Sequence, residues 1–198
     1  MFTFSFFSFL IPEFFLCVPV DTSSHSATCH NNKVAKEEIL NYYWREYGGK
    51  IPADAITGGR DINGDNVYIG QAYVQNRGLF IGQIKPGSTE MFITNHGVTK
   101  VDKYIKILCG FPPESFVWLQ TNATILHLTL LNKHSIIAGH EDGYGTMNIG
   151  RISYQGGTQV GKIKTFVVGN AYFHWPDVRG EDPGVKDYEV LVYEELKI

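Results

Sequence analysis

The chain repeats itself, and this internal repeat limits its possible folds more than any other feature of the sequence. In the first copy Gly59 and Gly70 are 11 residues apart, and in the second copy Gly139 and Gly150 have the same spacing. A third glycine follows 12 residues later in the first copy and 11 residues later in the second. Such a period is the signature of stacked structural units. We place the first copy at residues 41–110 and the second, more divergent copy at residues 115–195.

Each copy has the composition of short strands joined by tight turns. The dipeptides at 63–64 (Asn-Gly) and 142–143 (Asp-Gly) favour hairpin turns, and both precede runs rich in β-formers. Glycine accounts for 21 of 198 residues and aromatic residues for 14%, which suits a turn-rich β protein. A β unit of this length buries its apolar face best against its own copy. The sequence therefore predicts one all-β domain that is pseudo-symmetric and β-sandwich-like.

The second copy departs from the first in two segments. Residues 125–131 form an apolar insertion, which predicts either an extra strand or a partner surface. Residues 174–185 form a longer tip rich in Gly, Pro and Asp. Each copy closes on a Tyr-x-x-Ile or Tyr-x-x-Leu motif, at 104–107 and 188–191, and we align these two motifs with each other.

The N-terminal segment has some properties of a secretory signal peptide. Residues 1–20 contain an apolar stretch of suitable length, but no Lys or Arg precedes it, and Pro12 and Glu13 interrupt it. The same interruption argues against a membrane-spanning helix. Residues 21–40 read as a polar linker. We expect a secreted protein with a cleaved leader, and a cytoplasmic protein is the alternative.

Export would give two other features a role. Asn122 begins the chain's one glycosylation sequon, Asn-Ala-Thr. Cleavage of the leader would remove Cys17 and leave Cys29 and Cys109. Whether these two cysteines form a disulfide stays open.

The motifs of the first copy are specific enough to identify a family. Trp44, the run Ile-Pro-x-x-Ala-Ile-x-Gly-Gly-Arg-Asp at 51–61, Val-Tyr-Ile-Gly-x-Ala at 67–72 and Gly-Leu-x-x-Gly-x-Ile-x-Pro at 78–86 resemble the DM9 repeat. This is a family of invertebrate tandem repeats that includes mannose-binding lectins. The resemblance covers about residues 43–193 and implies two tightly packed β copies. It also implies calcium-independent recognition of mannose-type glycans, without a cofactor, in innate defence.

The resemblance implies particular sugar contacts. In sugar-binding members an Asp in an early turn and a Lys on a later strand hold the sugar hydroxyls, which suits an acceptor carboxylate and a donor ammonium. By position these roles fall on Glu141 with Lys162 in the second copy, and on Asp61 with Gln83 in the first. Lys85 lies two residues beyond Gln83, and so on the same strand face.

Neither copy holds the complete Asp–Lys pair, and the pair of Glu141 and Lys162 ranks first because its cation is in place. The alternative is that Asp61 caps its own turn and Lys162 is a solvated surface lysine.

Other chemistries find little support. The net charge of −3 gives no basic footprint for nucleic acid or anionic membrane. Residues 156–162 match the start of a phosphate-binding loop, but Ile163 stands where Ser or Thr should bind magnesium. No nucleophile motif or metal-ligand spacing occurs in the sequence.

We therefore predict a non-enzymatic protein whose partner is a mannose-type glycan, without metal or cofactor. The alternative is a structural or protein-interaction module that has lost sugar binding. A homodimer is expected to strengthen weak single-site contacts with sugars.

Overall fold

The structure is a computed structural model that describes residues 40–177 and 179–195. The expected leader, Cys29 and all but the last residue of the expected linker lie outside these residues. No helix in the described part of the chain is long and apolar enough to cross a membrane.

The first copy is an antiparallel arrangement built around one long central strand. This strand, β3, pairs with β2, β4 and β7, while β1 extends the sheet beyond β7 and the β5–β6 hairpin extends it beyond β4. The strands are β1 (Tyr42–Glu46), β2 (Thr57–Arg60), β3 (Asn66–Val74), β4 (Gly78–Ile84), β5 (Met91–Thr94), β6 (Val98–Val101) and β7 (Ile105–Gly110).

The second copy repeats this plan with β11 at its centre. β11 pairs with β10, β12 and β15, and β8 pairs with β15 as β1 pairs with β7. Its elements are the 3-10 helix η1 (Pro113–Ser115), β8 (Phe116–Asn122), α1 (Leu126–Thr129), β9 (His134–Ser135), β10 (Ile137–Glu141), β11 (Gly145–Tyr154), β12 (Gly157–Ile163), β13 (Phe173–His174), β14 (Gly184–Val185) and β15 (Asp187–Tyr193). The prediction of an all-β fold is confirmed.

The spaced glycines occupy equivalent places in the two copies. Gly70 of β3 faces Gly82 of β4, and Gly150 of β11 faces Gly161 of β12. The strands before them share an irregularity, since the register of β2 shifts before Gly59 and that of β10 shifts before Gly139. The common spacing therefore records a common backbone path.

The alignment of the two tyrosine motifs was wrong by one residue. Gly70 faces Ile107, whereas Gly150 faces Val190 and not Leu191. Tyr104 is consequently an exposed residue with φ of 54° just before β7, while Tyr188 is buried within β15. Side-chain identity misled the alignment because register is set by which residues face the core.

The apolar insertion of the second copy contains a short helix, α1, so of the two alternatives the extra strand was wrong. Leu126 is fully buried and anchors the helix, while Leu128 and Leu131 point into solvent. The ring nitrogen Nε2 of His127 lies 2.8 Å from the carbonyl oxygen of Thr165 and ties the insertion to the loop after β12.

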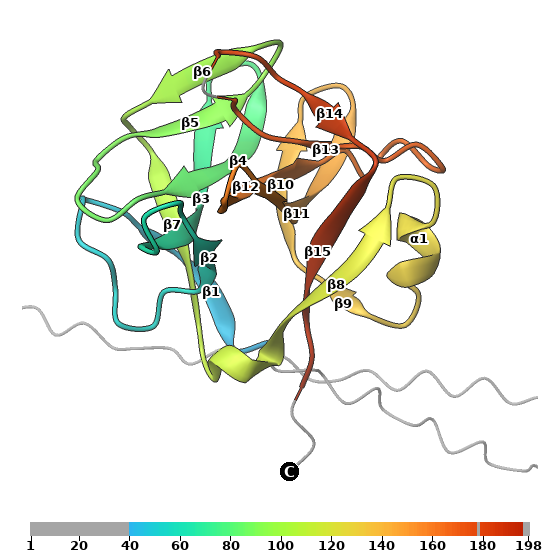
Figure 1. Cartoon of the computed structure of the whole chain (residues 1–198), viewed down its shortest axis with the longest axis horizontal. Coiled ribbons are helices and arrows are strands. Elements are labelled where there is room, and N and C mark those ends of the chain that lie inside the picture. The colour runs from blue at the N-terminus through green and yellow to red at the C-terminus, as the bar shows by residue number, and fades with distance from the viewer. Residues whose placement is uncertain (1–39, 178, 196–198) are drawn as a thin grey trace, which may run out of the picture. The chain divides into compact units, whose positions relative to one another are not determined.

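The two copies interlock by exchanging contacts in both directions. β10 of the second copy pairs with β4 of the first, and Figure 1 shows these strands side by side. The Gln71 amide donates to the carbonyl of Ala138 at 2.6 Å, and in the reverse direction the Arg151 guanidinium donates to the carbonyl of Gly58 at 3.0 Å. The larger hydrophobic core draws buried residues from both copies. The larger core is therefore shared by the two copies, while a second, smaller cluster lies within the second copy.

Cys109 lies in this core on β7, and burial raises the pKa of its thiol to about 11. Because the thiolate is the reactive form, we expect Cys109 to react at pH 8 at least about a hundredfold more slowly in the native protein than in denaturant. The rate is measured with a chromogenic thiol reagent on a variant carrying Cys17→Ser and Cys29→Ser. Equal rates in the two conditions would contradict the buried placement.

Candidate functional site

The acid and the lysine of the second copy do meet, but inside the protein. The Lys162 ammonium on β12 lies 3.8 Å from Oε2 of Glu141 at the end of β10. The side chains of Lys162 and Glu141 are 1% and 9% exposed. The ammonium also donates to the carbonyl of Thr94 at 2.7 Å and lies 5.0 Å from the ring centroid of Phe80. Lys162 therefore links its own copy to β4 and β5 of the other, and the alternative of a solvated lysine was wrong.

The surroundings of this ion pair are poor in polar partners. Burial lowers the pKa of Lys162, and the carboxylate of Glu141 opposes that shift. Nε2 of the exposed His96 lies 3.9 Å from Oε1 of Glu141. Within the described residues, Oε2 of Glu141 and Oγ1 of Thr94 are buried and have no hydrogen-bond partner. The low exposure of both charged groups makes this a closed ion pair of the second copy, which Thr94, Phe80 and His96 of the first copy contact.

Asp61 serves its own turn. Its Oδ1 atom accepts hydrogen bonds from the backbone N–H groups of Asn63 at 2.9 Å and Asp65 at 3.1 Å. No hydrogen bond or ion pair in the described residues joins Asp61 to Gln83. The geometry therefore agrees with the turn-capping alternative for this residue.

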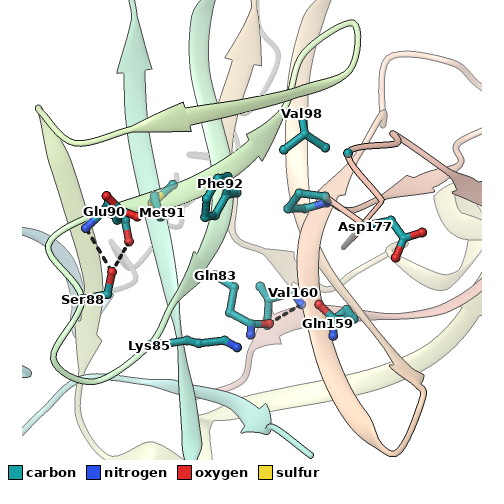
Figure 2. Close-up of a pocket in the computed structure, with 12 residues that line it drawn as sticks. Gln83, Lys85, Ser88, Glu90, Met91, Phe92, Val98, Gln159, Val160 and Asp177 are labelled. Carbon is teal, nitrogen blue, oxygen red and sulfur yellow. Dashed lines mark hydrogen bonds between the residues drawn. The ribbon is translucent and has the colours of Figure 1, made fainter.

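Gln83 and Lys85 line a pocket with a volume of about 480 Å³ between the two copies. Figure 2 shows both side chains in the pocket below Phe92 of β5, with Asp177 on the opposite side. Oε1 of Gln83 accepts a hydrogen bond of 3.1 Å from the backbone N–H of Val160. The two-residue spacing correctly predicted that Gln83 and Lys85 share a face.

The two copies thus use one strand position in different ways. Ile69 faces Gln83 in the first copy, and Ile149 faces Lys162 in the second, so Gln83 and Lys162 are structural equivalents. The lysine is enclosed by the other copy, whereas the glutamine lines an open pocket. The chemistry available to a ligand therefore lies on the side of Gln83.

Residues 15–102 match the family model of the DM9 repeat. The chain carries a DM9 repeat. No curated protein matches the chain. DM9 is a repeat of binding modules and not a known enzyme family, and the match supports a lectin-like or carbohydrate-binding module.

The DM9 match and the pocket overlap. Gln83, Lys85 and Phe92 all lie within the matched residues, whereas Glu141 and Lys162 lie beyond them. The divergent second copy completes the pocket with Gln159 and Asp177. Within the described residues, no group of three or more His, Cys, Asp or Glu side chains is placed to hold a metal ion.

Sequence reasoning missed the other residues that line this pocket, among them Phe92, Gln159 and Asp177. Phe92 alternates with the buried Met91 and Ile93 on β5, and this alternation was the available signal for an outward-facing aromatic. Gln159 and Asp177 reach the pocket only because the second copy folds against the first. The sequence carries no local signal for that approach.

Asn122 closes a turn at the end of β8. Its Oδ1 atom accepts hydrogen bonds from the backbone N–H groups of Thr124 at 3.0 Å and Ile125 at 3.1 Å. Glycosylation of this half-buried side chain stays a prediction.

Proposed function

We propose that the protein is a non-enzymatic, calcium-independent carbohydrate-binding protein of innate defence, and that the Gln83 pocket holds a mannose-type glycan. One observation carries the proposal: an open pocket of about 480 Å³ between the copies, with Gln83, Lys85 and Phe92 inside the DM9-matched residues, combines polar donors with an exposed aromatic ring. The ring is that of Phe92, a residue that is 46% exposed. A volume of this size is in the range of small-molecule sites.

The lining chemistry suits a sugar. The aromatic ring of Phe92 offers an apolar face to the C–H groups of a pyranose. The Gln83 amide and the Lys85 ammonium supply donors to hydroxyl oxygens. In this proposal Gln83 and Lys85 contact the glycan, Glu141 and Lys162 join the copies, and Asp61 holds its turn.

The proposal is tested by retention on immobilised mannose in the presence of EDTA. Phe92→Ala and Gln83→Ala are each expected to weaken binding at least about tenfold, because each removes a contact worth on the order of 1.4 kcal/mol. Tyr73→Ala is the matched control, since Tyr73 is an aromatic of similar exposure (48%) outside the pocket.

Two outcomes would contradict the assignment of the glycan to the Gln83 pocket. Unchanged retention of both pocket variants would contradict the assignment to Gln83 and Phe92. Loss of retention only in Lys162→Met, with a native fold, would place the glycan at the buried ion pair instead.

A second candidate function is a structural or protein-interaction module. The observation that favours it is that both expected sugar-binding pairs have a residue already occupied within the protein. Lys162 is buried, and Asp61 caps its own turn. Exposed Leu128 and Leu131 would then mark the partner surface. A glycan array without specific signals supports this candidate and contradicts sugar binding.

The proposal includes export of the chain and formation of a homodimer by two chains. Export is supported by the apolar leader at residues 1–20, and pairing by the gain in avidity that two weak sugar sites provide.

A further inference from the structure

We propose that the Gln83 pocket prefers a sugar that bears an anionic group, such as the carboxylate of a uronic acid, over the corresponding neutral sugar. This inference rests on the proposed function, because it specifies the glycan that the same pocket binds.

The first argument is the charge of the pocket. Its two acidic side chains already have cationic partners: the Lys100 ammonium lies 2.5 Å from Glu90, and the Arg179 guanidinium lies 2.9 Å from Asp177 and 3.7 Å from Glu181. Lys85 is exposed and makes no ion pair within the described residues. The Lys85 ammonium is therefore the one cation of the pocket lining, and no carboxylate of the described chain forms an ion pair with it.

The second argument is the direction of the donors. The Val160 N–H occupies Oε1 of Gln83, which leaves the Nε2 amide hydrogens for a ligand. Figure 2 shows the Lys85 side chain extending toward the Gln83 amide within the same pocket. Two donor groups, one of them charged, thus face one place, and a carboxylate or sulfate supplies at least two acceptor oxygens there.

The third argument identifies the ligand as a sugar and not a bare anion. Phe92 and Val98 form an apolar wall above the donors in Figure 2, and Pro176 adds apolar surface to the pocket lining. An inorganic phosphate would leave that wall in water, whereas a pyranose ring covers it. The ligand that fits both parts has an apolar ring face and an acidic substituent.

Lys162 of the second copy provides a comparison, because it is a lysine with a carboxylate partner inside the protein. There the ammonium of Lys162 meets Glu141 at 3.8 Å. Lys85 has no such carboxylate partner in the described chain, so its exposed ammonium is available to an anionic group of a ligand.

Calorimetric titration of the full-length protein with a matched sugar pair tests the inference. The probes are the methyl α-glycosides of mannose and of mannuronic acid, which differ only at C6. We expect the mannuronic acid glycoside to bind about tenfold more tightly at 20 mM NaCl, with the preference shrinking at 300 mM as salt screens the charge. The 6-sulfated mannoside, tested in the same way, distinguishes a carboxylate from a sulfate as the source of the anion.

Variants separate this inference from the proposed function. Lys85→Gln is expected to abolish the preference, because it weakens binding of the anionic glycosides more than binding of the mannoside, and Lys85→Arg is expected to retain it. Lys186→Gln, which changes an exposed lysine outside the pocket, is expected to change neither. Equal affinities of the wild type for the neutral and both anionic sugars would overturn the preference alone. Binding of none of the three would overturn the proposed function as well.

Discussion

Replacing Lys162 by methionine is expected to lower the free energy of unfolding by about 3–5 kcal/mol. The substitution keeps a long side chain beside Phe80 but leaves the Glu141 carboxylate buried without its cation, and removal of one member of a buried ion pair carries a cost of this size. It also removes the hydrogen bond to the Thr94 carbonyl. Urea denaturation followed by fluorescence measures the difference.

A double variant distinguishes the cost of the unpaired, buried Glu141 carboxylate from a general loss of core packing. Adding Glu141→Gln to Lys162→Met is expected to recover most of the loss, because no buried charge remains. Lys106→Met is the control, since Lys106 pairs with Glu46 at 3.5 Å on the surface, where such pairs contribute about 0–1 kcal/mol. A loss in Lys162→Met no larger than that of the control would contradict the buried ion pair.

The wild type also carries a pH signature of this pair. Because burial lowers the native pKa of Lys162, the unfolded chain binds the proton more tightly, and stability attributable to this residue rises with pH between the lowered native value and about 10.5. Lys162→Met removes that contribution.

Gly161→Ala is expected to destabilise the protein by about 3 kcal/mol or more, or to prevent folding. A Cβ atom at this position would lie 2.1 Å from the carbonyl oxygen of His174 on the neighbouring strand. Backbone cannot rotate away as a side chain can, so β12 and β13 would have to separate. Its counterpart in the first copy, Gly82, has a similar constraint, with the Phe92 carbonyl oxygen at 2.5 Å.

Gly48→Ala is the matched control for this substitution. A Cβ atom on Gly48 meets nothing within 4 Å, and we expect a change below about 0.5 kcal/mol. Both variants are compared by thermal and urea unfolding. Similar stabilities for Gly161→Ala and Gly48→Ala would show that the strands are not so closely apposed.

The sequence predicted the parts of the fold that depend on local spacing. Gly70 and Gly150 were aligned correctly because their neighbours Gly82 and Gly161 must also lack side chains. The alignment of Tyr104 with Tyr188 failed because one of them lies outside a strand, which no local pattern indicates. The insertion was equally ambiguous, since a short apolar run suits a strand or a buried helix.

The candidate site was harder to predict because the Glu141–Lys162 ion pair and the Gln83 pocket both depend on contacts between the copies. The sequence predicted Glu141 and Lys162 as a pair, and their charged groups lie 3.8 Å apart. Their burial depends on Thr94 and Phe80, which come from the other copy. The pocket around Gln83 likewise needs the Val160 N–H, and such approach across copies has no signature in a single strand.

The interlocked hydrogen bonds have a consequence for how such a molecule diversifies. A protein with a single copy would have to associate with an identical chain to obtain the contacts that Gln71 and Arg151 make here, and symmetry would force both halves to stay alike. Joining the copies in one chain removes that constraint, because each half keeps its neighbour at high effective concentration whatever its sequence. The second copy can then keep Lys162 as a buried contact to its neighbour, while the first copy keeps Gln83 at the same strand position in an open pocket.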